Sequence, residues 1–320
     1  MLYINRFFKC KIDVLLIELK NTIDKITKFE IRRITKKTLT FLLNIHIYLR
    51  LKSIIRYNSG SLLYIKKLRY AYWDKILSSK FSIKDNIIIL IYQLEFIDKY
   101  GLFEIINNLT INPVFIWSLS DSINKFGITL SVPQSIKEGM ISLIYTFNDE
   151  DVFVLKYSII PGCIVQSLSD NVIFISVMQL VKNKKDIYQQ CICKNFGTTP
   201  QRNLFYALLG IAKRLNIAEI YCVNAESQVY FQKDNLSFYE TYNNFINTFD
   251  TVELRNSYYL LKLPYNEKPI QSITSSHRRR AKVRRKFNQD IQDSVYMSFD
   301  SIIHAINLEK EKNYLISCFK

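Results

Sequence analysis

Seven cationic side chains lie within ten residues near the C-terminal end of the sequence, between His277 and Lys286. The planar guanidinium group of arginine offers paired N–H donors that match the oxygens of a phosphate group. The composition and spacing of this cationic segment therefore predict an anion-binding site. The side chains that we expect to bind the anion are Arg278, Arg279, Arg280, Lys282, Arg284 and Arg285.

The cationic segment is predicted to lie on a helix over residues 272–297, with Ser275 or Ser276 as its N-cap. Successive helical residues are rotated by about 100°, so the cations point all round the axis. The apolar residues that would pack one edge of this helix on the body are Val283, Phe287, Ile291 and Val295. Several guanidinium groups are then free to bind a ligand or a lipid. The alternative is that they are solvated or paired with acidic neighbours.

Basic residues are concentrated towards both ends of the chain. Residues 1–70 hold sixteen Lys and Arg against four Asp and Glu, whereas the rest of the chain outside the cationic segment is nearly neutral. This asymmetry favours an anionic partner, and we expect an anionic lipid or the phosphates of lipopolysaccharide. Nucleic acid is not expected, because Phe287 is the one base-stacking aromatic between His277 and Gln292. The alternative is a solvated basic surface.

A second candidate site follows from a strand around Gln179, a helix over residues 204–216 and a strand over residues 220–223. This succession looks like the second half of a GNAT-type N-acyltransferase. In that fold the N-terminus of the helix receives the pyrophosphate of an acyl-CoA cofactor. The likeness implies that Gln201 and Arg202 bind the cofactor. The typical Gly-x-Gly phosphate loop does not occur here, so the likeness concerns the fold more than catalysis.

If the protein is an enzyme, we expect an acyltransferase that acts on an amine of the envelope or of a protein. Glu138 would then be the base for the amine, and Tyr230 or Tyr239 the acid for the leaving thiolate. The alternative is that these three residues lie at the surface or at the edge of the core. No structural metal is expected, because the three histidines are scattered and Cys191 and Cys193 lack the usual zinc spacing.

Hydrophobic periodicity predicts an α+β protein with a helical region over residues 1–110 and an α+β core over residues 111–320 that ends in the basic helix. Residues 12–26 are predicted to form an amphipathic helix, and helical patterns continue to residue 77 and over residues 87–100. The core is expected to hold a mixed, GNAT-like sheet with packed helices. Its expected strands are 126–132, 140–147, 152–160, 172–181, 219–223 and 252–263, and its expected helices are 204–216, which Pro200 precedes, 239–249 and 272–297.

The sequence predicts a cytoplasmic protein that associates peripherally with the inner membrane. No cleavage site of small residues follows the first apolar stretch, and the longest apolar windows are shorter than the roughly 20 residues of a spanning helix. The amphipathic helix 12–26 and the basic helix are the candidates for contact with the membrane. The alternative for helix 12–26 is packing on its own domain. Six scattered cysteines fit reduced thiols.

Motifs spread over residues 40–300 resemble the VirK/YbjX family. They include Leu130-Ser131-Val132-Pro133 with Glu138-Gly139, the strand that contains Gln179, Gly197 and Pro200 before the helix 204–213, residues 220–224, Leu263-Pro264, and Ser276-His277-Arg278-Arg279-Arg280-Ala281 with Arg284-Arg285. The resemblance implies a bacterial virulence protein that supports the state of the cell envelope or the surface display of a virulence factor, or the biogenesis pathway of such a factor. It implies no particular reaction.

Overall fold

The computed structural model describes residues 75–99, 106, 109–234, 238–249 and 252–318. The chain forms two compact units, residues 1–54 and residues 55–320, and all described residues belong to the second. The predicted division of the chain at residue 110 stays a prediction. The predicted amphipathic helix 12–26 lies outside the described residues.

The core of the described unit is one mixed sheet of eight strands in the order β1-β2-β3-β4-β5-β6-β8-β7. The strands are β1 (Val114–Ser120), β2 (Lys125–Ser131), β3 (Ile141–Phe147), β4 (Glu150–Pro161), β5 (Asn171–Leu180), β6 (Glu219–Val223), β7 (Val252–Arg255) and β8 (Tyr258–Lys262). Helices pack on this sheet, so the predicted α+β class and the mixed sheet are confirmed.

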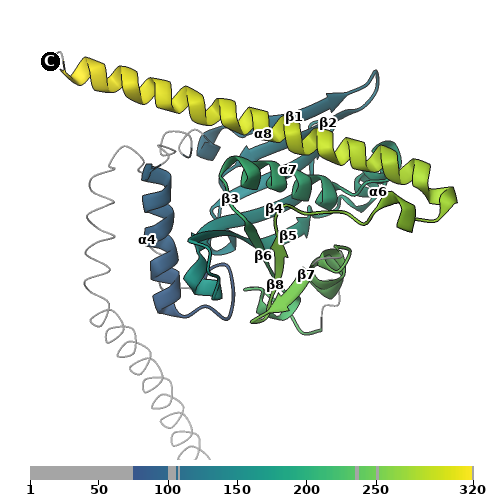
Figure 1. Ribbon diagram of the computed structural model, residues 1–320, viewed down its shortest axis with the longest axis horizontal. Coiled ribbons are helices and arrows are strands. Elements are labelled where there is room, and N and C mark those ends of the chain that lie inside the picture. The colour runs from purple at the N-terminus through teal and green to yellow at the C-terminus, as the bar shows by residue number, and fades with distance from the viewer. Residues whose placement is uncertain (1–74, 100–105, 107–108, 235–237, 250–251, 319–320) are drawn as a thin grey trace, which may run out of the picture. The chain divides into compact units, whose positions relative to one another are not determined.

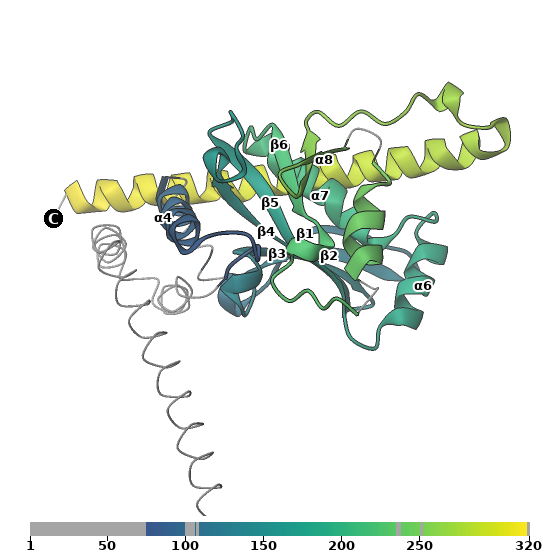
Figure 2. The same cartoon turned by 90° about the horizontal axis from the view of Figure 1, so that it is seen from below.

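Among the described residues, four longer helices accompany the sheet, together with short helical turns. They are α4 (Ile83–Lys99), α6 (Lys185–Lys194), α7 (Pro200–Arg214) and α8 (Ser275–Cys318). The short turns are η1 (Ile136–Glu138), η2 (Gly162–Val165), η3 (Ala225–Ser227), the π-helix η4 (Tyr239–Asn244) and η5 (Ile270–Ser272). Helices α4 and α6 lie at opposite ends of the sheet (Figure 1 and Figure 2).

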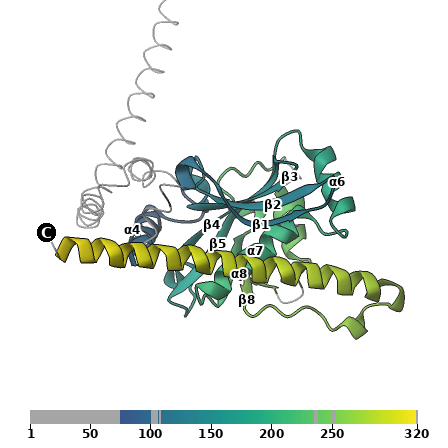
Figure 3. The same cartoon turned by 90° about the horizontal axis from the view of Figure 1, so that it is seen from above.

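The long helix α8 runs across α7 and β1, and it contacts both (Figure 3). The Phe287 ring meets the Trp117 ring of β1 edge-on, with 5.9 Å between ring centroids. Of the predicted apolar seam, Phe287, Ile291 and Val295 are buried, whereas 44% of Val283 is exposed. Helix α8 also extends well beyond the predicted end at residue 297, to Cys318. The residues between β8 and α8, 263–274, are called the strap below.

Helix α7 begins where the sequence provides an N-cap and a proline. The Thr199 hydroxyl accepts a hydrogen bond from the Arg202 backbone N–H at 3.3 Å, and Pro200 occupies the first turn, where its missing N–H costs nothing. Apolar residues spaced three and four apart then bury the helix against β3, β4 and α8. The expected helix 204–216 is therefore confirmed, but it begins at Pro200 and ends at Arg214.

Helices α6 and α7 connect β5 to β6, which is the only parallel pair among the described strands. Three residue pairs join the two strands, the last of them Ile175 with Cys222. Strand β5 continues to Leu180 while β6 ends at Val223, so the two strands part towards the N-terminus of α7. There the Met178 backbone N–H donates to the Tyr242 hydroxyl of η4 at 3.3 Å.

Three local expectations differ from the structure. The expected strand 252–263 is a hairpin, β7 and β8, which turns at Asn256 and Ser257. Both turn residues have positive φ, 49° and 70°, the conformation that a two-residue hairpin turn requires. The expected helix 239–249 begins as the π-helix η4. Strand β1 and helix α6 were not predicted.

Candidate anion-binding site

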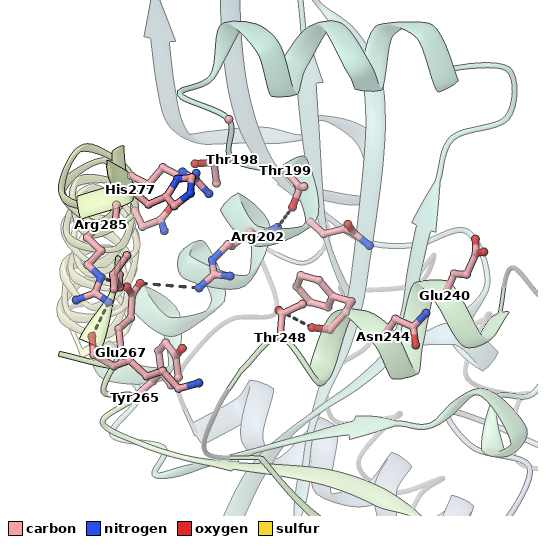
Figure 4. A pocket seen from close by; sticks show the side chains of 18 residues that line it. Thr198, Thr199, Arg202, Glu240, Asn244, Thr248, Tyr265, Glu267, His277 and Arg285 are labelled. Carbon is pink, nitrogen blue, oxygen red and sulfur yellow. Dashed lines mark hydrogen bonds and ion pairs between the residues drawn. The ribbon is translucent and has the colours of Figure 1, made fainter. Parts of the chain in front are cut away.

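A hollow of about 610 Å³ lies where the N-terminus of α7 faces α8 (Figure 4). Four segments line it: residues 197–202 at the start of α7, residues 240–248 in and after η4, the strap, and residues 277–288 of α8. The hollow therefore joins the two sites that the sequence predicts separately. Gln201 and Arg202, the expected cofactor ligands, share its lining with Arg284 and Arg285 of the cationic segment.

The start of α7 gives one wall of this hollow a positive potential. The first backbone N–H groups of a helix lack partners within the helix, and the helix dipole places partial positive charge there. Gly197 and Thr198 lead into this end, and Gly197 has a φ of +72°. Apart from Gly197 itself and its two chain neighbours, no described residue has an atom within 4 Å of where a Gly197 Cβ would stand, so the approach to the helix end is open. Such ends bind phosphate groups.

One face of α8 forms the facing wall. The residues of α8 that line the hollow are His277, Ala281, Arg284, Arg285 and Asn288, which recur at spacings of three and four. Residues with these spacings share one side of a helix. The hollow is therefore lined by a stripe of α8, and this stripe presents two of the arginines.

Three polar atoms in the lining have no hydrogen-bond partner among the described residues. They are Thr198 Oγ1, Arg284 Nε and Asn288 Oδ1. Thr198 and Asn288 each expose only 2% of their surface. Buried polar groups in proteins are nearly always hydrogen-bonded, since an unmade bond costs about 1–3 kcal/mol. A bound molecule with both acceptor and donor groups would complete these contacts.

Glu267 of the strap neutralises part of the positive charge in the hollow. Its carboxylate forms an ion pair with Arg285, accepts a hydrogen bond from the Tyr206 hydroxyl, and lies 4.0 Å from Arg202 (Figure 4). Burial, together with this carboxylate, raises the pKa of the Tyr206 hydroxyl. The hydroxyl therefore stays protonated and donates a hydrogen bond to Glu267.

Other arginines of the cationic segment hold the strap through its backbone carbonyls. Arg278 donates from Nε to the Ile273 carbonyl at 2.9 Å and from a terminal nitrogen to the Gln271 carbonyl at 3.0 Å. Arg285 donates in the same way to the Lys268 carbonyl. The strap is thus fastened to the first turns of α8 by side chains that the sequence assigns to anion binding.

The remaining predicted anion ligands lie away from the hollow. Arg279, Arg280 and Lys282 are exposed, and none of them lines the hollow. Within the described part of the chain, no hydrogen bond or ion pair engages these three side chains. The structure therefore divides the cationic segment into three parts. Arg284 and Arg285 form an inner group, Arg278 holds the strap together with Arg285, and Arg279, Arg280 and Lys282 form an outer group.

The three predicted catalytic residues do not line the hollow. Glu138 is at the end of η1, where its carboxylate forms an ion pair with Lys156 of β4. Tyr230 is 47% exposed, and the Tyr239 hydroxyl lies 3.4 Å from the Glu226 carboxylate. Their catalytic roles stay predictions, because nothing in the geometry of this hollow bears on them.

Sequence reasoning missed several residues that complete the hollow. Asn288 follows Arg284 by four residues, so its place on the same helical face could have been found from the spacing. Thr198 precedes the N-cap and could have been included with it. Glu267 belongs to an irregular segment, and no periodicity in the sequence connects it to Arg285.

Two further properties of the described residues concern metal-binding clusters and membrane-spanning helices. No three of their His, Cys, Asp or Glu side chains gather closely enough to hold a metal ion. None of the helices that they form has both the length and the apolar character needed to cross a membrane.

Comparison with protein families identifies the family to which the chain is similar. The model of a family described as "Protein of unknown function (DUF535)" matches residues 20–296, which include the sheet and the part of α8 that lines the hollow. No curated protein and no solved structure matches the chain significantly.

Proposed function

Since the chain belongs to the DUF535 family, which includes the VirK/YbjX proteins, we propose that it supports the bacterial cell envelope by binding a phosphate-bearing ligand in the hollow between α7 and α8. In this proposal it is a virulence protein that acts from the cytosolic side and associates peripherally with the inner membrane. Its effect is on the state of the envelope or on the surface display of a virulence factor.

The observation that carries the proposal is that Arg284 and Thr198 both line the hollow and each has an unpartnered polar atom there. The Arg284 Nε and the Thr198 hydroxyl both lack partners among the described residues, and both can donate to an anionic oxygen. The start of α7 adds backbone donors and the positive end of a dipole. Hydrogen bonds between charged donors and phosphate oxygens are short and strong.

The outer group of cations supports contact with an anionic membrane surface. Arg279, Arg280 and Lys282 are exposed, and they lie outside the lining of the hollow. Basic residues close to an anionic bilayer contribute about 1 kcal/mol each, and salt weakens this attraction. The outer group would hold the protein at the lipid surface, while the inner group binds the phosphate of a lipid or of lipopolysaccharide.

Calorimetric titration of the full chain tests the phosphate site. The probes are inorganic phosphate and a water-soluble, short-chain phosphatidic acid, and the variants are Arg284→Ala and Arg279→Ala. Both changes remove one arginine from α8, so Arg279→Ala is the matched control. We expect Arg284→Ala to weaken binding of both probes by about tenfold or more, which is the effect of a lost charged hydrogen bond. Arg279→Ala should leave both affinities unchanged.

Equal losses in the two variants would contradict a site in the hollow, and the absence of binding to either probe would sink the proposal. Circular dichroism and thermal unfolding check that each variant folds. Sedimentation with phosphatidylglycerol and phosphatidylcholine vesicles tests the outer group separately. There Arg279→Ala, and not Arg284→Ala, is expected to reduce binding to the anionic vesicles at low salt.

N-acyl transfer from an acyl-CoA-type donor is the second candidate. The parallel pairing of β5 with β6 beside α7 supports it, because the N-terminus of α7 would receive the diphosphate of the donor. It comes second because Glu138, Tyr230 and Tyr239 do not line the hollow. Coenzyme A and acetyl-CoA in the same titration test it: binding that Arg284→Ala abolishes supports this candidate, and no binding rejects it.

A further inference from the structure

The wall of the hollow that η4 and the following residues form differs in charge from the walls formed by α7 and α8. Glu240, Asn244 and Thr248 line this wall, and each of them is exposed. Figure 4 shows Glu240 and Asn244 on one side of the hollow and His277 and Arg285 on the other. The hollow is thus cationic at one end and carries a carboxylate and an amide at the other.

The groups at this far end mainly accept hydrogen bonds. The Glu240 carboxylate is only an acceptor, and the described residues make no ion pair with it. The Thr248 hydroxyl donates a hydrogen bond to the Phe245 carbonyl at 2.7 Å, which leaves the hydroxyl oxygen as an acceptor. A ligand that satisfies this end must therefore present donors, and Glu240 favours a donor with positive charge.

The cationic end of the hollow, between α7 and α8, requires acceptor groups on the ligand, because its arginines and the start of α7 are donors. Asn288 is the exception. Its Oδ1 is an acceptor without a partner, so a donor group of the ligand is needed there, near the phosphate position. At about 610 Å³ the hollow is also within the usual size of a small-molecule site and much larger than a phosphate ion. A ligand of that size has groups at both ends of the hollow.

We infer that the ligand of the hollow is a phosphate ester whose other end carries an amine. The phosphate lies against Arg284, Thr198 and the start of α7, and the amine lies near Glu240. A hydroxyl of the ligand donates to Asn288 Oδ1. This inference rests on the proposed phosphate site and adds the class of molecule that it selects.

Calorimetric titrations of the full chain with four probes measure separately what the phosphate and the amine contribute to binding. They are inorganic phosphate, glucose 6-phosphate, glucosamine 6-phosphate and glucosamine, all at a mildly acidic pH that keeps the amine protonated. We expect glucosamine 6-phosphate to bind most tightly, about threefold more tightly than glucose 6-phosphate. The factor is small because Glu240 is exposed and solvent screens its charge. Glucosamine without the phosphate should bind weakest.

The variant Glu240→Gln tests the amine end while it leaves the phosphate end intact. It should abolish the preference for glucosamine 6-phosphate over glucose 6-phosphate and leave the affinity for inorganic phosphate unchanged. The matched control is Glu253→Gln, which alters an exposed carboxylate of β7 outside the hollow and should keep the preference.

The results of these titrations distinguish a failure of the inferred amine end from a failure of the proposed phosphate site. If phosphate binds and depends on Arg284, but the amine adds nothing or Glu240→Gln has no effect, the inference is wrong and the proposed phosphate site remains. If no phosphate-bearing probe binds, both are wrong. A preference for the amine that disappears only in Glu240→Gln establishes the inference.

Discussion

The Glu267 carboxylate and the Arg285 guanidinium form an ion pair in the wall between two neighbouring hollows. The second hollow, of about 640 Å³, shares Tyr265, Glu267 and Arg285 with the candidate site. Glu267 therefore already provides a negative charge next to the place where a phosphate would bind. An entering anion competes with this carboxylate for Arg285 and Arg202.

This competition predicts that Glu267→Gln strengthens phosphate binding. The amide removes the negative charge, while its carbonyl oxygen can still accept the hydrogen bond from Tyr206. An ion pair near the surface contributes up to about 1 kcal/mol, so we expect the Kd for inorganic phosphate to fall by up to about fivefold. Calorimetric titration measures it, with Glu253→Gln as the control that removes an exposed carboxylate elsewhere. A weaker affinity in Glu267→Gln would contradict a phosphate site beside Arg285.

The cysteines are predicted to differ in reactivity according to burial. Burial raises the pKa of the Cys191 thiol to about 12, and it also raises the pKa of the Cys222 thiol. The thiolate is the reactive form, so these two side chains should resist iodoacetamide at pH 8. Cys163 and Cys193 are exposed and should be alkylated first. Mass spectrometry of peptides after a short reaction measures this, and rapid labelling of Cys191 in the folded protein would contradict its burial.

Asp121 is predicted to make the turn between β1 and β2 sensitive to acid. The Asn124 side chain and the backbone N–H groups of Asn124 and Ile123 donate to its carboxylate, which lowers its pKa below 3.8. Because the pKa is lower in the folded state, the stabilisation is complete above pH 3.8 and is lost as the pH falls through the folded-state pKa.

The variant Asp121→Ala should consequently lower the melting temperature at neutral pH and have a smaller effect in strong acid. Thermal unfolding followed by circular dichroism over a series of pH values measures the difference between wild type and variant. Asp290→Ala, which alters an exposed carboxylate of α8, is the control and should show no such trend. A difference that stays constant down to low pH would mean that the carboxylate charge does not act in this turn.

Most of the sheet could be predicted because its central strands carry strong local signals. Strands β2 to β6 are largely buried runs, and β6 has the predicted bounds, Glu219–Val223. Strand β1 was missed because five of its seven residues are exposed and give no alternating pattern. The hairpin of β7 and β8 was read as one strand because its turn, Asn256-Ser257, lacks the glycine that usually marks such turns.

The candidate site was predictable only in its parts. The N-cap Thr199 and Pro200 locate the start of α7, and the arginines locate an anion site. Periodicity alone could not assign Arg284 to the hollow and Arg279 to solvent, because that choice depends on how α8 sits on α7. The ion pair of Glu267 with Arg285 depends on the path of the strap, which contains no repeating pattern.

The close approach of α7 to α8 at Gly210 gives the last prediction. A Cβ on Gly210 would lie 2.4 Å from the Gln292 backbone oxygen and 3.1 Å from the Tyr296 backbone nitrogen. These are backbone atoms of α8, so the helix itself must move to make room. In an isolated helix, changing Gly to Ala stabilises by about 1 kcal/mol. Here we expect Gly210→Ala to destabilise the protein by about 1–3 kcal/mol, the usual cost of overpacking.

The same movement should weaken the candidate site, since Asn288 and Arg284 lie one and two turns before Gln292 on α8. We expect Gly210→Ala to lower both the melting temperature and the affinity for inorganic phosphate. Ser294→Ala, a small change on the exposed side of α8, reports the effect of helix propensity alone and should alter neither value appreciably. A variant Gly210→Ala that is more stable than wild type would show that the two helices do not pack as closely as described. Lower stability with unchanged affinity would mean that the ligand does not depend on the position of α8.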